Sequence, residues 1–153
     1  MKSLLYKLGY PILKGYWFIV RPKTQGVKCL ILFKDQVLLI RHTYGHSLWT
    51  LPGGGFKKGE TKEVAVKREV KEELGLHIKP EFLGEFTHNT EHKIDTVYCF
   101  VAKIEKTEPV IDPGEILEAR WCNLKELPKN HSTGLDRILK MYQRDIIPPH
   151  SLP

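Results

Sequence analysis

The chain of 153 residues is long enough for one domain with a single buried core, and its composition, 41% hydrophobic and 27% charged, excludes an intrinsically disordered protein. Its formal net charge is +6, but five basic residues and no acidic residue lie within positions 1–26, so the rest of the chain is close to neutral. This distribution argues against a nucleic-acid surface spread over the whole domain, and it directs any electrostatic partner to the N-terminal segment.

That N-terminal segment, residues 1–25, combines basic residues with tyrosine and tryptophan. Its apolar stretches are interrupted by Lys7, Pro11 and Lys14, so it lacks the pattern of a signal peptide or of a membrane-spanning helix. Contact with RNA or with a membrane surface is one interpretation, and packing against its own domain or a second subunit is the simpler one. No DNA partner is expected. The oligomeric state is left open, with a dimer as one option.

The predicted elements are of mixed α/β type, with pairs of strands on either side of one central helix. Apolar and β-branched runs predict strands at 27–33 and 36–42, followed by a loop with Pro52 and three consecutive glycines. The remaining predicted elements are a helix from Thr61 to Leu74, extended segments at 78–87 and 93–104, a short strand at 118–124 and a helix at 133–146. We expect a domain over residues 26–147 with a mixed α/β fold and a loose tail at 148–153.

The three cysteines, Cys29, Cys99 and Cys122, all fall in apolar runs without a CxxC spacing. A free cysteine in such a run behaves as a small hydrophobic residue. This pattern predicts a reduced, cytoplasmic protein and argues against a zinc site.

Three glutamates of the helix predicted at 61–74 lie on one side of it. At 100° per residue, Glu69, Glu72 and Glu73 share an arc of about 100° that borders the buried stripe. Among helical neighbours three and four positions away, only Glu72 has a basic partner, Arg68. We therefore expect a largely unpaired acidic cluster, whose repulsion something else must offset.

Clustered carboxylates that supply only oxygen atoms suit a hard divalent cation such as Mg²⁺, with Mn²⁺ as a substitute. Mg²⁺ prefers a few carboxylates together with substrate phosphate, so the cluster predicts a phosphate-bearing substrate. Gly53, Gly54 and Gly55 stand just before the helix and let the backbone approach an ion closely. A backbone carbonyl there would be a further oxygen ligand.

From Gly54 to Leu76 the spacing becomes specific. The fixed positions are Gly54, Glu60, Arg68, Glu69, the aliphatic Val70, Glu72, Glu73, Gly75 and the aliphatic Leu76. This pattern resembles the signature box of the Nudix hydrolases at every fixed position, and a looser similarity extends over residues 26–127.

The resemblance implies an α/β/α sandwich with a curved mixed β-sheet and a central metal-binding loop and helix. It also implies hydrolysis of nucleoside diphosphates linked to another group, by attack of water on one phosphorus. The implied metal ligands are Glu69, Glu73 and a backbone carbonyl of Gly53 or Gly54, with Glu72 as a further ligand or as a group that orients the water. Arg68 and Glu60 would hold the loop and the helix in register, as supporting residues of metal ligands generally do.

In many relatives a glutamate outside the box also contributes to catalysis. Glu115, six residues before Trp121, is the first candidate for the general base, Glu118 the second and Glu91 the third. The alternative for each is a solvated acidic residue of a loop or strand edge. Tyr44, His46 and His88 are weaker candidates for the substrate side, and Trp49 is expected to pack against the loop.

The lead hypothesis is a Mg²⁺-dependent pyrophosphohydrolase of a nucleotide, with nucleoside triphosphates and ADP-ribose among the candidate substrates. A non-catalytic module that senses a nucleotide is the second hypothesis, although a sensor has no need of a complete set of acidic residues. The third is an enzyme that acts on 5′-triphosphate RNA, for which the basic N-terminus would attract the RNA backbone.

Overall fold

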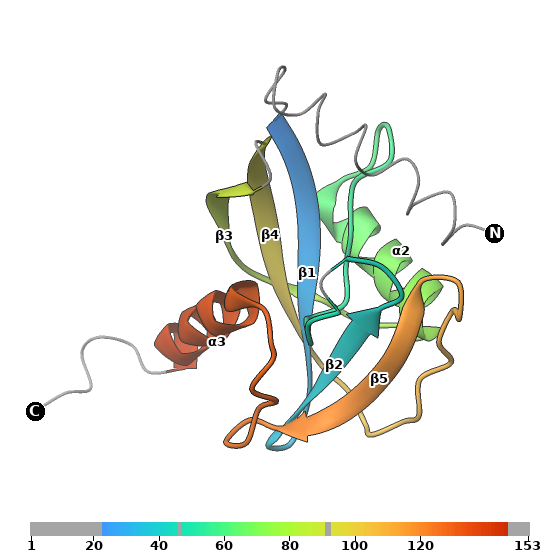
Figure 1. The fold of residues 1–153 in the computed structure, drawn as a ribbon. Coiled ribbons are helices and arrows are strands. Elements are labelled where there is room, and N and C mark those ends of the chain that lie inside the picture. Colours follow the sequence, from blue (N-terminus) through green and yellow to red (C-terminus); the bar gives the residue numbers. More distant parts are fainter. Residues whose placement is uncertain (1–22, 46, 91–92, 147–153) are drawn as a thin grey trace, which may run out of the picture.

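The computed structural model describes residues 23–45, 47–90 and 93–146, which form one mixed β-sheet and two long helices (Figure 1). The elements in chain order are β1 (Lys23–Phe33), β2 (Gln36–His42), α2 (Lys62–Leu74), β3 (Glu81–Thr90), β4 (Lys93–Lys103), β5 (Ile116–Asn123) and α3 (Thr133–Ile146). The strand order is β3-β4-β1-β2-β5. Strands β1 and β4 are parallel, and the other neighbours are antiparallel.

The two helices cover opposite faces of this sheet. Side chains of α2, including Val66 and Val70, pack against the face of β1 that carries Val27 and Ile31. Leu135 of α3 joins the second core cluster on the other face, together with Leu30, Leu32, Val37 and Leu39 of β1 and β2. The alternation along β1 follows the two-residue period of a strand. The predicted α/β/α sandwich is confirmed.

Strands β1 and β2 diverge, and the glycine-containing loop occupies the space between them. Their pairing is confined to the turn end, with Leu32 opposite Val37 and Phe33 opposite Gln36. Further along β1, Cys29 N donates to Pro52 O at 3.0 Å, and Val27 N donates to Gly54 O at 2.8 Å. The loop is therefore held to β1 by backbone hydrogen bonds and is presented to α2.

The predicted ends of α2 are confirmed by their capping contacts. The Thr61 side chain accepts a hydrogen bond from Val64 N, and Gly75 ends the helix in the left-handed conformation with φ 67°. The predicted start of β1 is wrong by four residues, because its parallel pairing with β4 already begins at Lys23. A polar strand end stabilised by such pairing has no hydrophobic pattern of its own.

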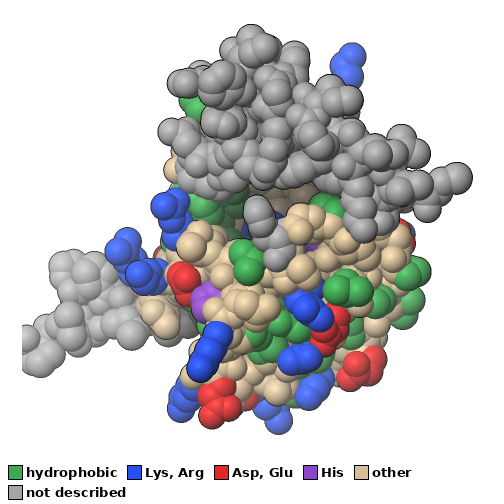
Figure 2. Space-filling model, viewed as in Figure 1, with side chains coloured by type: hydrophobic (Ala, Val, Ile, Leu, Met, Phe, Trp, Pro, Cys, Tyr) green, Lys and Arg blue, Asp and Glu red, His purple; other side chains and the backbone are tan. Residues whose placement is uncertain are grey.

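Basic and acidic side chains are mixed over the end of the molecule that carries the β1–β2 turn, on the face shown in Figure 2. Within the described residues, no helix is long and apolar enough to cross a membrane. Residues 1–22, which include most of the basic N-terminal segment, and the tail at 147–153 lie outside the described residues, so contact of that segment with RNA, a membrane or a second subunit stays a prediction. Cys29, Cys99 and Cys122 are buried free thiols.

Candidate functional site

The centre of the candidate site is the buried carboxylate of Glu73, which α2 directs at the glycine loop. The Glu73 side chain is only 3% exposed. Its Oε2 accepts a hydrogen bond from Gly53 N at 2.8 Å, and its Oε1 lies 3.9 Å from Nδ1 of His42. One side chain thus connects the helix, the loop and the end of β2.

Gly53 is required at this position by two independent constraints. Its φ of 133° is a conformation that residues with a Cβ rarely adopt, and a Cβ there would lie 2.1 Å from the Val27 carbonyl oxygen. Gly54 is less strictly required, because the three atoms nearest to a Cβ on it, each at 2.8 Å, all belong to the movable carboxylate of Glu69. The loop therefore lies against β1 on one side and against the glutamates on the other.

Arg68 joins the loop to the exposed edge of α2. Its Nε and Nη2 donate to the two carboxylate oxygens of Glu60 at 2.6 and 2.9 Å, and Nη2 also donates to Gly55 O at 2.8 Å. Its Nη1 donates to Glu69 at 2.7 Å and to Glu72 at 3.0 Å. This fork of hydrogen bonds raises the pKa of Arg68 and, with a backbone hydrogen bond, lowers the pKa of Glu60 to about 2.

The sequence-based expectation of a largely unpaired acidic cluster is wrong for Glu69, and Glu72 has a second partner besides the expected Arg68. Glu69 pairs with the adjacent Arg68, and Glu72 pairs with both Arg68 and Lys57, whose ammonium lies 2.9 Å from Glu72 Oε1. Counting helical neighbours misses the Glu69–Arg68 pair because these residues are adjacent in sequence, and it misses the Glu72–Lys57 pair because Lys57 comes from the loop. Glu73 differs from both, since its side chain is buried against the glycine loop.

Lys28 is a member of the site that the sequence analysis missed. From β1 its ammonium donates to the carbonyl oxygens of Leu51 at 2.7 Å and Gly53 at 3.1 Å. Burial lowers the pKa of Lys28, and the negative charges of Glu73 and, to a lesser extent, Glu69 and Asp95 oppose this shift. The sequence signal was weak: a lysine inside an apolar strand run is ordinarily a residue of the solvent face.

Burial is also the main cause that raises the pKa of Glu73 to about 7, and the negative charges of Glu69 and Glu115 add to it. The charge of Lys28 and the hydrogen bond from Gly53 oppose the shift. In His42 the same surroundings act in the other direction: burial and the charge of Lys28 lower its pKa to about 4. His42 is therefore neutral at pH 7.

Of the glutamates considered as the general base, Glu115 is near enough to Glu73 for its charge to act on it, whereas Glu118 is paired with arginines. The negative charge of Glu115 acts on Glu73, and its backbone carbonyl accepts a hydrogen bond from Thr43 N at 2.9 Å. Glu118 instead forms ion pairs of 2.6 Å with both Arg41 and Arg120 on the sheet.

The other candidates are divided between packing residues and undescribed positions. Tyr44 stacks on His42, next to the site, with ring centroids 5.1 Å apart. Trp49 is buried and has arginine side chains over its ring, as expected of a packing residue. Glu91, His46 and the side chain of His88 lie outside the described residues.

The residues fit a divalent cation in their chemistry. As they are placed, the described residues contain no group of three or more His, Cys, Asp and Glu side chains that could hold a metal ion. The candidate ligands, which are the glutamate carboxylates and the loop carbonyls, are nevertheless all oxygens, and oxygens suit Mg²⁺. The negative charges of Glu69 and Glu115 contribute to the raised pKa of Glu73, so negative charge is concentrated around this carboxylate. A bound cation would neutralise that charge.

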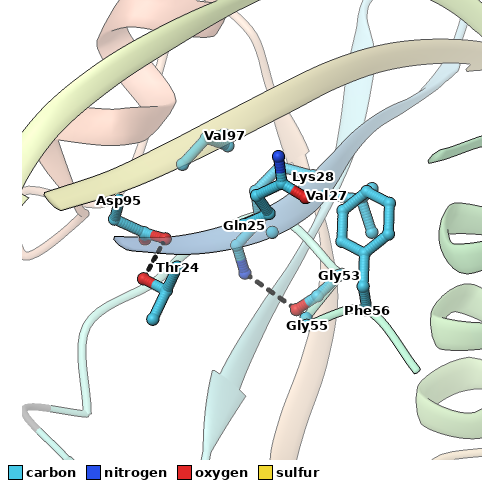
Figure 3. Close-up of a pocket in the computed structure, with 11 residues that line it drawn as sticks. Thr24, Gln25, Val27, Lys28, Gly53, Gly55, Phe56, Asp95 and Val97 are labelled. Atoms are coloured by element: carbon cyan, nitrogen blue, oxygen red, sulfur yellow. Dashed lines mark hydrogen bonds between the residues drawn. The ribbon is translucent and has the colours of Figure 1, made fainter. Parts of the chain in front are cut away.

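A pocket of about 720 Å³ lies beside the loop, over β1 and β4 (Figure 3). Its lining includes Gly53, Gly54 and Phe56 from the loop and Thr24 and Asp95 from the strands. A second pocket, of about 320 Å³, shares three lining residues with it and reaches the start of α3. Pockets of this size hold small-molecule ligands in many proteins.

The model of the NUDIX domain family matches residues 22–142 of the chain. The chain belongs to the Nudix family. An NAD-capped RNA hydrolase, NudC, from Salmonella heidelberg is 36% identical over 109 residues, which are 68% of this chain and 42% of the relative. The chain thus spans about two fifths of that relative's length.

Solved structures give the same fold. A MutT Nudix hydrolase from Burkholderia pseudomallei superposes with a TM-score of 0.72 at 25% identity, covering 78% of this chain and 97% of the other. A MutT protein from Methanosarcina mazei superposes with a TM-score of 0.74 at 22% identity, covering 84% and 98%. The predicted Nudix fold is confirmed, as is, at the level of the family, the prediction of a pyrophosphohydrolase enzyme.

Proposed function

We propose that this Nudix protein hydrolyses a pyrophosphate bond in a nucleoside diphosphate derivative, such as a nucleoside triphosphate or ADP-ribose, with Mg²⁺ or Mn²⁺ as cofactor. The observation that carries the proposal is the buried Glu73 carboxylate, held by Gly53 N at 2.8 Å in a loop that borders the 720 Å³ pocket. Buried carboxylates with raised pKa values are a common feature of catalytic sites. The family supplies the reaction class.

The residues that would hold the cation are Glu69, Glu72 and Glu73, with a carbonyl of Gly53 or Gly54. When bound, such a cation neutralises phosphate charge and lowers the pKa of a water molecule. Lys28 fixes the loop for this task, because its ammonium holds the carbonyls on both sides of Pro52.

Glu115 is the proposed general base, which would accept a proton from the attacking water. Its charge acts on Glu73, so its carboxylate stands near the other acids of the site. A general base must lie within hydrogen-bond reach of the proton that it takes, directly or through one water molecule. Glu118 is less suited, because both of its oxygens already pair with arginines.

The test is a phosphate-release screen with Mg²⁺ across nucleoside triphosphates, ADP-ribose, dinucleoside polyphosphates and sugar nucleotides. In the best substrate class, Glu73→Gln should lower kcat by about 10³-fold or more, because it removes a charge while keeping the acceptor for Gly53 N. Glu63→Gln is the matched control, since Glu63 is an exposed glutamate in the first turn of the same helix. It should retain wild-type turnover.

Two results would contradict the proposal. One is Mg²⁺-dependent turnover in Glu73→Gln equal to that of the control. The other is an absence of turnover in every class together with nucleotide binding that the variant leaves unchanged, which would support the sensing module.

A second candidate substrate is a nucleotide joined through its pyrophosphate to the 5′ end of RNA. The relatives named NAD-capped RNA hydrolases favour it, and so does the basic N-terminal segment. Binding of a capped or 5′-triphosphate RNA should then weaken steeply as salt rises. RNA affinity that is weak and insensitive to salt would count against this candidate. The cytoplasmic location and the domain boundaries at residues 26 and 147 stay predictions.

A further inference from the structure

We propose that Asp95 reads the nucleobase of the substrate and selects bases with an exocyclic amino group over uracil and thymine. This inference rests on the proposed function, because it assigns the pocket beside the loop to the nucleoside. The loop end of the pocket, at Gly53 and Gly54, would receive the phosphates.

The two ends of the pocket differ in chemistry. Asp95 and Thr24 lie at one end and Phe56 at the other, with the glycine loop between them (Figure 3). The Thr24 hydroxyl donates to Asp95 Oδ1 at 2.7 Å, which fixes the orientation of the carboxylate. An ionised carboxylate has about four acceptor sites and no donor. Asp95 therefore retains acceptor sites for hydrogen-bond donors of a ligand.

The strand register places this acceptor at a suitable distance from the loop. Thr24 is opposite Asp95 across the β1–β4 pair, and Val27 is the residue bonded to Gly54. Three residues of strand separate the two positions, which is roughly 10 Å. A nucleoside with its 5′ phosphate at the loop would span this distance and bring the edge of its base to Asp95.

The remaining lining supports an aromatic ring with an anionic group attached. Val97 lies next to Asp95 on the same face of β4, and both residues also line the second pocket. The Lys28 ammonium lies between Asp95 and the loop, where it contacts Gly53 O and provides positive charge toward the phosphate end. From one end to the other, the pocket thus presents the acceptor Asp95, the apolar surface of Val97 and the cation Lys28. This order matches the base, the sugar and the phosphate of a nucleotide.

An acceptor-only group discriminates between bases. Adenine, cytosine and guanine each carry an exocyclic amine that can donate to a carboxylate, whereas uracil and thymine carry carbonyl oxygens at their exocyclic positions and have a donor only at N3–H. A pose that directs the exocyclic amine of cytosine at Asp95 directs a carbonyl oxygen of uracil at it, which leaves both groups without a donor and adds repulsion. A site built around one polar group rejects the analogue that cannot pair with it.

The test measures binding rather than turnover, so that it is independent of the catalytic proposal. Full-length protein in a metal chelator is titrated with AMP, CMP and UMP in a calorimeter. Wild-type protein should bind AMP or CMP about 10- to 100-fold more tightly than UMP. Asp95→Asn should bring the ratio close to one, because the amide offers a donor as well as an acceptor.

Asp35→Asn is the matched control, since Asp35 is an exposed aspartate in the turn between β1 and β2. It should leave the ratio unchanged. Thr24→Val, which removes the hydroxyl that orients Asp95, should reduce the ratio partly. Thermal unfolding of each variant shows that the fold is retained.

Two outcomes would overturn the inference. One is a wild-type protein without base preference, or a preference that Asp95→Asn leaves intact. The other is an equal loss of affinity for all three nucleotides in Asp95→Asn, which would assign Asp95 to the ribose or to the fold. A base preference that depends on Asp95 in a protein without turnover would refute only the proposed function.

Discussion

Glu72 and Glu73 are consecutive residues of one helix, yet they lie in opposite environments. Glu72 is 47% exposed and pairs with Lys57 and Arg68, which hold its pKa below the ordinary value. Glu73 is 3% exposed and accepts Gly53 N, and burial raises its pKa to about 7. The comparison shows that the position around the helix, not the residue type, decides what a carboxylate of this cluster does.

The same contrast extends to the residues around each glutamate. The buried side, formed by Gly53, Glu73 and Lys28, has low exposure and backbone contacts that leave little freedom. The exposed edge, formed by Lys57, Arg68 and Glu72, is made of long side chains in contact with water. Free energies of interaction should therefore be large on the buried side and small on the exposed edge.

The largest effect is expected from Gly53→Ala. The new Cβ would clash with the Val27 carbonyl and would occupy a disfavoured φ, so the free energy of unfolding should fall by about 3–5 kcal/mol. Urea denaturation measures this change. Gly55→Ala is the control, because nothing lies within 4 Å of a Cβ there, and it should cost at most about 1 kcal/mol. Equal losses of unfolding free energy in Gly53→Ala and Gly55→Ala would contradict the special constraint on Gly53.

The next effect is the pH dependence of stability caused by Glu73 in protein freed of metal by a chelator. Its pKa is raised from 4.5 to about 7, so the folded state holds the proton more tightly than the unfolded chain. This contribution is complete below about pH 4.5 and is lost as the pH rises through 7. Relative to Glu73→Gln, the wild-type protein should lose about 3 kcal/mol of unfolding free energy over this range.

His42 acts in the opposite direction, so only the difference between variants isolates Glu73. The pKa of His42 is lowered from 6.5 to about 4, and the unfolded chain therefore binds its proton more readily. Stability from this residue falls as the pH falls from 6.5 to 4, which partly cancels the slope due to Glu73. The check is to measure the free energy of unfolding of both proteins at several pH values. If it changes with pH by the same amount in wild type and in Glu73→Gln, burial does not raise the pKa of Glu73.

Most of the fold could be predicted from the sequence because its signals are local. Strand alternation, the cap at Thr61 and the glycine at position 75 each depend on a few neighbouring residues, and the structure confirms them. The start of β1 could not be predicted, because its pairing with β4 joins residues about 70 positions apart. No local pattern records such a contact.

The acidic residues of the candidate site could be predicted from the sequence, but most of their ion pairs could not. The spacing of the glutamates is a property of the helix, so Glu69, Glu72 and Glu73 could be placed on one side of it. Lys28 and Lys57 reach the cluster from β1 and from the loop, and only the tertiary structure brings them there. The expected lack of an ionic partner was wrong for Glu69, which pairs with the adjacent Arg68, and the count of helical neighbours also missed Lys57 as a partner of Glu72.

A moderate effect is expected from Arg68→Lys. Lysine keeps the charge but cannot reproduce the fork that contacts Glu60, Gly55 and Glu72 together. The midpoint of thermal unfolding should fall by roughly 3–6 °C, and kcat should fall with it because the loop loses its tie to α2. Arg144→Lys, at an exposed position in the last turn of α3, is a control that should change neither. An unchanged kcat in Arg68→Lys would mean that the loop is held from the buried side alone.

The smallest effect on stability is expected from Glu72→Gln. Glu72 is itself 47% exposed and Lys57 is 61% exposed, so the lost attraction is largely screened and is offset by the side-chain freedom that is regained. The free energy of unfolding should change by at most about 0.5 kcal/mol, and added salt should reduce even that difference. Affinity for Mn²⁺, measured by electron paramagnetic resonance, should nevertheless fall if Glu72 contributes to the cation site. If Glu72→Gln lost as much unfolding free energy as Gly53→Ala, the exposed edge would contribute as much to stability as the buried side. That result would overturn the contrast between the two neighbouring glutamates.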